Sequence, residues 1–167
     1  MFVLFLDMDG VLVTEQSYFY WNQQGDETRK EIMGASRFCP IAVSNLNYLC
    51  ANVPELRIVI SSSWRTYYSL EQIQSLLEED GFLHRDRLID VTQVLSLHGN
   101  DRRFMEISKW LEKHGEVTDW VAIDDHDYNI PEENLCLTPQ EVGFTIDHAY
   151  TIIQRLMPKW QRPIFLM

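Results

Sequence analysis

The sequence is poor in cysteine, glycine, proline and positive charge. Its 3 cysteines, Cys39, Cys50 and Cys136, are an odd number without Cys-x-x-Cys spacing, which argues against a disulfide framework or a zinc site and favours a reducing compartment. We expect each of them to be a small core residue. The 7 glycines and 6 prolines stand against 46% hydrophobic residues, a balance that excludes fibrous and disordered chains.

Long hydrophobic runs are also missing. The apolar start is interrupted by Asp7 and Asp9, too early for a signal peptide, and no later run approaches the length of a membrane span. We therefore expect a cytoplasmic protein with no membrane contact.

Positive charge is scarce, with 14 Lys and Arg against 25 Asp and Glu and a formal net charge of −11. On average such a surface repels nucleic acid, anionic membranes and phosphorylated substrates. We expect no strong nucleic-acid surface, because tight binding normally uses many Lys and Arg contacts to phosphates. Any site that handles phosphate must gather its own cations.

What the chain does contain is an alternation of short apolar runs and helical patterns, within a length of 167 residues that suits one domain over 1–167. The runs that predict strands are Phe2–Leu6, Arg57–Ile60, Trp120–Ile123 and Asn134–Leu137; the patterns that predict helices are Ile41–Ala51, Ser69–Glu79, Arg102–Lys113 and a last helix from an N-cap at Thr145 to Pro158. This order predicts an α/β fold, a three-layer, doubly wound, Rossmann-like parallel sheet with its ligands beyond the carboxyl ends of the strands. The apolar tail Pro163–Met167 fits either a last strand or an oligomer contact.

The stretch 14–38 shows neither a helical nor a strand period and carries Tyr18, Phe19, Tyr20 and Trp21. It leaves directly from the Asp-Met-Asp-Gly turn, so it can be a flap that covers a site at the strand ends. The same aromatic residues can equally pack a long loop onto the core. Both interpretations stay open.

Two carboxylates, Asp7 and Asp9, follow the first strand, and Gly10 gives the backbone freedom to bring both to one ligand. One carboxylate can attack phosphorus, while the other protonates the leaving oxygen and later activates water. We predict Asp7 as the nucleophile and Asp9 as the general acid and base. Because carboxylates repel a phosphate dianion, this chemistry needs a hard divalent cation, and Mg²⁺ suits a site with few protein ligands.

Asp124 and Asp125 follow a later strand and can complete the metal site. Taken alone, the pair would more often be a turn cluster.

A polar cluster after the second strand offers phosphate ligands. Ser61 can donate its hydroxyl to a phosphoryl oxygen, Ser62 and Ser63 are alternatives to it, and Arg65 can bind phosphate in a bidentate manner. A further cation is needed, and the candidates are Arg103, favoured by its place near a helix start, Arg102 and Lys109.

In this order the four clusters resemble the haloacid dehalogenase superfamily of phosphohydrolases. The strong first signature is Asp-Met-Asp-Gly-Val at 7–11; Ile-Ser-Ser-Ser-Trp-Arg at 60–65, Arg-Arg-Phe-Met-Glu-Ile-Ser-Lys-Trp-Leu at 102–111 and Ala-Ile-Asp-Asp at 122–125 look like the other three. More narrowly, the last two, with Leu-Thr-Pro and Gly-Phe-Thr after them, are similar to a domain of RNA-repair proteins, and the phosphatase module of phage polynucleotide kinase has a related plan.

The resemblance implies roles for these residues: Asp7 as nucleophile, Asp9 as acid and base, Ser61 as phosphate ligand and Arg103 in the third role, with Asp7, the backbone carbonyl of Asp9, Asp124 and Asp125 around Mg²⁺. The superfamily often uses Lys in the third motif, which keeps Lys109 as the alternative to Arg103. No large cap domain fits between the motifs, so the resemblance implies an open site and a phosphorylated substrate that can be macromolecular.

Three functions compete on this basis. The first is a Mg²⁺-dependent phosphatase that acts on a phosphate monoester through an aspartyl phosphate on Asp7. The second is a phosphate-sensing or protein-interaction module with little turnover, since a fold never guarantees activity. The third is transfer of phosphate to an acceptor other than water. The retained acid and base residue, Asp9, favours the first.

Overall fold

The computed structural model describes residues 1–23, 37–96 and 99–156. Its centre is a five-stranded sheet in the order β3-β2-β1-β4-β5, with every pairing parallel. The strands are β1 (Phe2–Leu6), β2 (Leu56–Ile60), β3 (Leu88–Val91), β4 (Asp119–Asp124) and β5 (Leu135–Leu137). This arrangement confirms the predicted α/β fold with a parallel sheet.

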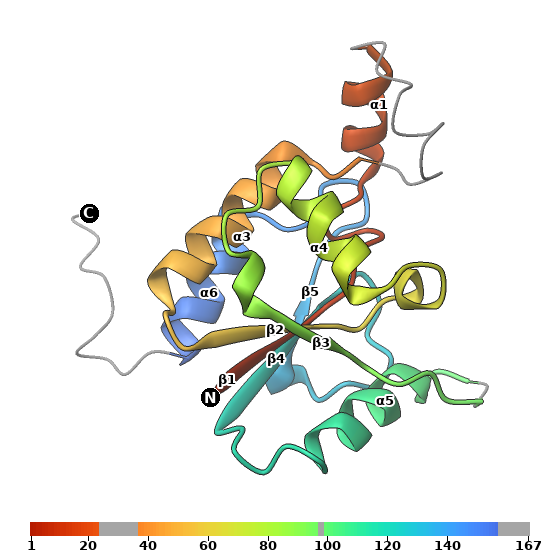
Figure 1. The fold of residues 1–167 in the computed structure, drawn as a ribbon, viewed down its shortest axis with the longest axis vertical. Coiled ribbons are helices and arrows are strands. Elements are labelled where there is room, and N and C mark those ends of the chain that lie inside the picture. The colour runs from red at the N-terminus through yellow and green to blue at the C-terminus, as the bar shows by residue number, and fades with distance from the viewer. Residues whose placement is uncertain (24–36, 97–98, 157–167) are drawn as a thin grey trace.

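Helices cover both faces of the sheet, as Figure 1 shows for α3 and α6 on one side and α5 on the other. The helices are α1 (Glu15–Gln23), α3 (Pro40–Asn52), α4 (Leu70–Glu79), α5 (Arg102–Leu111) and α6 (Ile146–Leu156), and the short 3-10 helices are η1 (Ser63–Thr66), η2 (Arg85–Arg87) and η3 (Glu132–Asn134). None of the helices in the described ranges is long and apolar enough to cross a lipid bilayer.

Strand β1 explains the three layers, because both of its faces are apolar. Leu4 and Leu6 pack into a cluster that includes the buried side chains of α3, α4 and α6. Val3 and Phe5 point to the opposite face and pack with Ile107 and Trp110 of α5. Because the strand is buried on both faces, its sequence is a continuous apolar run and does not alternate with polar residues.

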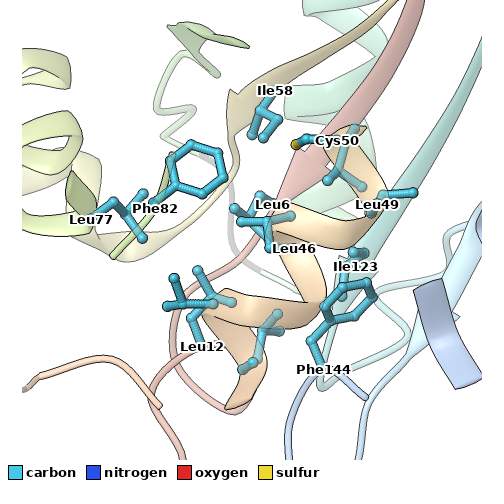
Figure 2. Close-up of a cluster of buried hydrophobic side chains, with 14 of the residues drawn as sticks. Leu6, Leu12, Leu46, Leu49, Cys50, Ile58, Leu77, Phe82, Ile123 and Phe144 are labelled. Carbon is cyan, nitrogen blue, oxygen red and sulfur yellow. The ribbon is translucent and has the colours of Figure 1, made fainter. Parts of the chain in front are cut away.

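The larger cluster lies between α3 and the sheet, where Figure 2 shows Leu46 and Leu49 of α3 beside Leu6 and Ile123 of the strands. All three cysteines are buried and unpaired, which confirms the prediction that they are core residues. Burial raises the pKa of Cys50 and of Cys136 to about 12, so both thiols stay protonated and inert.

One strand and one α-helix were not predicted, and neither were the three short 3-10 helices. Strand β3 is short and interrupted by a polar residue, Asp90, so its sequence lacks the apolar run that marks the central strands. Helix α1 occupies the first part of the stretch predicted to lack secondary structure. Its aromatic residues are consecutive and mark no single face, but Thr14 and Ser17 cap it reciprocally: the Thr14 N–H donates to Ser17 Oγ (3.0 Å) and the Ser17 N–H to Thr14 Oγ1 (3.1 Å). A Thr-x-x-Ser spacing is a cap signal that was available in the sequence.

The remaining strands and α-helices match the predicted ones to within a few residues at their ends. Ser69 caps α4 through a capping box with Gln72, and the Thr145 hydroxyl accepts from the His148 N–H (3.4 Å) at the start of α6. The rest of the proposed flap, 24–36, and the apolar tail lie outside the described residues.

Candidate active site

The register of the sheet places three of the predicted residues at one level. Leu6 of β1 pairs with Ile60 of β2 and with Ile123 of β4, so the next residues along each strand are Asp7, Ser61 and Asp124. Backbone hydrogen bonds continue the pairing by one step: the Ser61 N–H donates to Leu6 O (2.9 Å) and the Asp7 N–H to Ile123 O (3.1 Å). The carboxyl ends of three neighbouring parallel strands thus present their side chains together.

A tight turn after Asp7 carries Asp9 beyond the sheet. Gly10 has a φ of +70°, and its N–H donates to Val13 O (2.8 Å). Asp7 is buried, whereas Asp9 is exposed. The turn therefore separates the two carboxyl groups: one lies at the floor of the site and the other at its rim.

Burial dominates the electrostatics of Asp7. It raises the pKa of this carboxyl above its ordinary value, against the opposing effects of the Arg103 charge and a hydrogen bond from Ser62. The pKa of Asp124 is raised for similar reasons. Burial and the neighbouring charge of Asp7 raise it to about 7, while Arg103 opposes the shift. Two carboxylates this close to each other favour a bound cation.

Arg103 on α5 lies where the clusters meet. Its Nη2 is 3.3 Å from Asp7 Oδ1 and its Nε is 3.1 Å from Asp124 Oδ2, and its Nη1 donates to the backbone carbonyl of Ser61. The Tyr128 ring packs 5.2 Å from its guanidinium carbon. Burial lowers the pKa of Arg103, but the adjoining carboxylates outweigh this effect and raise it, so the guanidinium is a permanent charge in the site.

The other candidate cations are not placed in the same way. Lys109 and Arg102 are exposed on α5, and Arg102 Nε lies 3.9 Å from Glu106 Oε1. Arg65 is buried and forms an ion pair with Glu106, with 2.5 Å between Arg65 Nη2 and Glu106 Oε2. It also donates to the backbone carbonyl of Ser62. The Arg65 Nε is buried without a hydrogen-bond partner in the described ranges, so protein groups satisfy only the two Nη atoms of this guanidinium.

The Ser61 hydroxyl has the surroundings expected of a ligand-binding group. Ser61 is 2% exposed, and its Oγ has no hydrogen-bond partner within the described ranges. A buried hydroxyl without a partner is costly and uncommon in proteins. By contrast, the Ser62 Oγ accepts from the Trp64 N–H (3.3 Å) and caps η1. Ser63 is exposed. Of the three serines, Ser61 is therefore the one whose hydroxyl is available at the level of Asp7.

Asp124, Asp125 and His126 offer a possible cation site at the end of β4. One ligand atom from each lies within 4.8 Å of the others. The Asp124 carboxylate accepts from the His126 N–H (3.0 Å), and the Asp125 carboxylate lies 2.8 Å from His126 Nδ1. The oxygen donors of Asp7, Asp124 and Asp125 are the type that Mg²⁺ prefers.

Sequence reasoning missed the residues that support the first motif from the segment 138–144. The Thr138 hydroxyl donates to Gly10 O (2.9 Å) and the Phe144 N–H donates to Val11 O (2.9 Å). Gly143, at a φ of +75°, lets the chain approach so closely that a Cβ would lie 2.4 Å from Val11 O. In the sequence, these residues stood out only as the triplets Leu-Thr-Pro and Gly-Phe-Thr of the family resemblance. Their contacts with the first motif could not be inferred from the triplets.

The parallel sheet, with paired carboxylates, a serine hydroxyl and a buried arginine at its carboxyl edge, defines a domain of the haloacid dehalogenase (HAD) superfamily. More specifically, residues 3–149 match a family model described as the HAD domain in Swiss Army Knife RNA repair proteins, and the chain belongs to this family. No curated protein and no solved structure matches the chain significantly. The superfamily supports a phosphohydrolase-type function in broad terms.

Proposed function

We propose that this protein is a Mg²⁺-dependent phosphatase that hydrolyses a phosphate monoester through an aspartyl phosphate on Asp7. The observation that carries the proposal is the position of Arg103, whose one guanidinium contacts Asp7, Asp124 and the Ser61 carbonyl. Because those groups come from three different strand ends, a single buried cation links all four sequence clusters. A site built only for structural stability would not need the unpartnered Ser61 hydroxyl beside it.

The reaction begins with attack of an Asp7 carboxylate oxygen on phosphorus. The bond from phosphorus to the leaving oxygen breaks, and Asp9 gives its proton to that oxygen. In the second step Asp9 takes a proton from water, whose oxygen bonds to phosphorus as the bond to Asp7 breaks. Inorganic phosphate leaves, and both carboxyl groups return to their initial state.

Ser61 and Arg103 bind the phosphoryl oxygens during both steps. The Ser61 hydroxyl donates a hydrogen bond, and the Arg103 charge stabilises the negative charge on the transferring group. When bound, Mg²⁺ reduces the repulsion between the carboxylates and the phosphate; Asp7, Asp124, Asp125 and the backbone carbonyl of Asp9 would hold it. The role of Arg65 in this proposal is to hold the Ser62 carbonyl.

The test is phosphate release from p-nitrophenyl phosphate with and without Mg²⁺. We expect activity only with the metal, and we expect Asp7→Asn to abolish it because an amide cannot form the phosphoenzyme. The matched control is Asp86→Asn, which changes a carboxylate that is 82% exposed and lies outside the site. Release without metal, or full activity in the Asp7 variant, would contradict the mechanism. Metal binding without turnover on any phosphate ester would instead support a sensing module.

The family description also indicates which substrate to test first. Relatives belong to RNA repair proteins, so we propose that the phosphate is carried on the end of an oligoribonucleotide. A terminal phosphate can enter an open site without the extended basic surface that a net charge of −11 disfavours. The comparison is kcat/KM for 3′- and 5′-phosphorylated oligonucleotides against phosphosugars and phosphopeptides. A higher kcat/KM for phosphosugars or for phosphopeptides than for the oligonucleotides would overturn the RNA assignment.

A further inference from the structure

The Asp9 carboxylate contacts an indole that comes from the second motif. Trp64 Nε1 lies 3.2 Å from Asp9 Oδ1 and 3.1 Å from Asp9 Oδ2, so one N–H is shared between both oxygens. Asp9 is exposed, whereas Trp64 is only 8% exposed. An exposed carboxylate normally samples several rotamers, and this contact holds it to one region of the site.

The indole is itself rigidly held. Its ring packs against Phe38 at 5.3 Å and against Tyr68 at 5.4 Å between ring centroids. Its backbone belongs to η1, which begins two residues after Ser61, and the Trp64 N–H donates to Ser62 Oγ. The segment that carries the phosphate-binding hydroxyl therefore also carries the group that orients Asp9.

The chemistry of the donor suits a residue that must act as both acid and base. Indole N–H donates and cannot accept, and it bears no charge. A cationic donor in this place would stabilise the ionised carboxylate alone, whereas a neutral donor can orient the carboxylate and the carboxylic acid.

We infer that Trp64 is a positioning residue, which holds Asp9 where it protonates the leaving group and then activates water; this inference rests on the proposed phosphatase function. Fixing a catalytic group in its reactive geometry lowers the barrier because less motion must be lost in the transition state. Trp64 acts through Asp9 and needs no contact with the substrate.

The test exploits the fact that a good leaving group needs no proton. We compare kcat/KM for p-nitrophenyl phosphate, which releases a stable anion, with that for an alkyl phosphate, which releases a basic alkoxide unless it is protonated. In Trp64→Phe we expect kcat/KM for the alkyl ester to fall about tenfold further than for the nitrophenyl ester, a fraction of the usual effect of general acid catalysis. A merely structural role would lower both values equally.

A second readout follows the base step. With p-nitrophenyl phosphate the first step needs no proton from Asp9, but hydrolysis of the phosphoenzyme needs Asp9 as base. Rapid mixing of Trp64→Phe should therefore show a burst of nitrophenolate, about one equivalent per enzyme, because the second step becomes slower than the first. Absence of both the burst and the leaving-group effect would overturn the inference.

The matched control is Trp110→Phe. Trp110 is also buried, and its Nε1 donates to a carboxylate, Asp90 Oδ2, at 2.7 Å, but it lies on the other face of the sheet. This variant removes the same kind of hydrogen bond, so it should lower thermal stability without a leaving-group effect. If Trp64→Phe does not fold, Trp64→Met repeats the comparison with a side chain that adapts to irregular space.

A double-mutant cycle separates this inference from the proposed function. Asp9→Asn should itself show the leaving-group effect, and adding Trp64→Phe to it should produce no further discrimination between the two esters. If Asp9→Asn does not discriminate between the esters, the proposed role of Asp9 is wrong. If Asp9→Asn discriminates between the esters and Trp64→Phe shows neither discrimination nor a burst, the phosphatase mechanism stands and the role of Trp64 is wrong.

Discussion

Ser61 and Ser62 are adjacent serines that the structure treats differently. The Ser61 hydroxyl is buried with no partner in the described part of the chain, and the Ser62 hydroxyl accepts from the Trp64 N–H. The repeated serines in Ser-Ser-Ser-Trp-Arg could not be separated by sequence, because neighbouring residues of the same type differ only in where the backbone points them. A residue whose polar group is unsatisfied in the protein is available to a ligand.

We predict opposite effects of Ser61→Ala on activity and on stability. Activity should fall about 100-fold in kcat/KM, as for the loss of one preorganised donor, while stability should stay equal or rise by about 1 kcal/mol because a buried unpaired hydroxyl is removed. Phosphatase assays and urea unfolding measure the two effects. Ser63→Ala is the control: Ser63 is exposed, so both activity and stability should stay near those of the wild type. A less stable Ser61→Ala with normal activity would refute the assignment.

Gly10 also acts at the scale of one residue. A Cβ at this position would lie 2.5 Å from Asp125 Cγ, and its φ of +70° is strained for other residues. We predict that Gly10→Ala displaces Asp125 and raises the Mg²⁺ concentration needed for half-maximal activity, as measured by a metal titration.

The control for that variant is Gly81→Ala. Gly81 has a φ of +93° but open space around its Cβ position, so the substitution costs only the backbone strain, about 1 kcal/mol. If Gly10→Ala keeps the metal dependence of the wild type and loses no more stability than Gly81→Ala, the close approach of Asp125 to the first motif is unimportant.

At the scale of elements, α5 contributes two buried charges to the site. Arg103 faces Asp7 and Asp124, and Glu106, one turn further on, pairs with Arg65 and accepts from the Leu95 N–H (3.1 Å). The helix therefore connects to the segment after β2 through one ion pair, Glu106 with Arg65, and to the ends of β1 and β4 through the ion pairs of Arg103. Burial lowers the pKa of Arg65, and the charge of Glu106 opposes that shift.

We predict that Glu106→Gln destabilises the protein by about 3–5 kcal/mol, because it leaves the Arg65 guanidinium buried without a counter-charge. The control is Glu78→Gln, which breaks the exposed pair of Arg85 and Glu78 (2.6 Å) and should cost less than about 1 kcal/mol. Urea unfolding compares the two variants. Similar small losses in both would show that the Arg65 and Glu106 pair contributes little to the fold.

At the scale of the whole molecule, folding and metal binding should be linked. A cation that binds only the folded chain adds about 2.7 kcal/mol of stability at one hundred times its Kd. We therefore predict a rise in the melting temperature with Mg²⁺ that EDTA reverses and that Asp125→Asn removes.

Ionic strength is the necessary control for this prediction, because a chain with a net charge of −11 repels itself and salt screens that repulsion. NaCl at matched ionic strength should raise the melting temperature less than Mg²⁺ does. Equal shifts with both salts, or an unchanged Mg²⁺ shift in Asp125→Asn, would show that the metal acts only by screening.

Local patterns were enough to predict the α/β class and the positions of the polar clusters along the chain. Continuous apolar runs, helical periods and the polar residues after each run are local patterns, so β1, β2, β4 and β5 and the clusters that follow three of them could be predicted without coordinates. Strand β3 could not, because the polar residue Asp90 interrupts its short apolar pattern. Helix α1 was missed because its consecutive aromatic residues mark no single helical face, although the cap signal at Thr14 and Ser17 was present in the sequence.

Tertiary structure alone decided how the clusters combine. The order β3-β2-β1-β4-β5 and its register bring Asp7, Ser61 and Asp124 to one level. The contact of Arg103 with Asp7 spans 96 positions, and that of Trp64 with Asp9 spans 55. Contacts at such separations depend on strand order and side-chain packing. The local periodicity of the sequence carries no information about either. The contacts of Arg103 with Asp7 and Asp124 and the pairing of Arg65 with Glu106 belong to this level for the same reason.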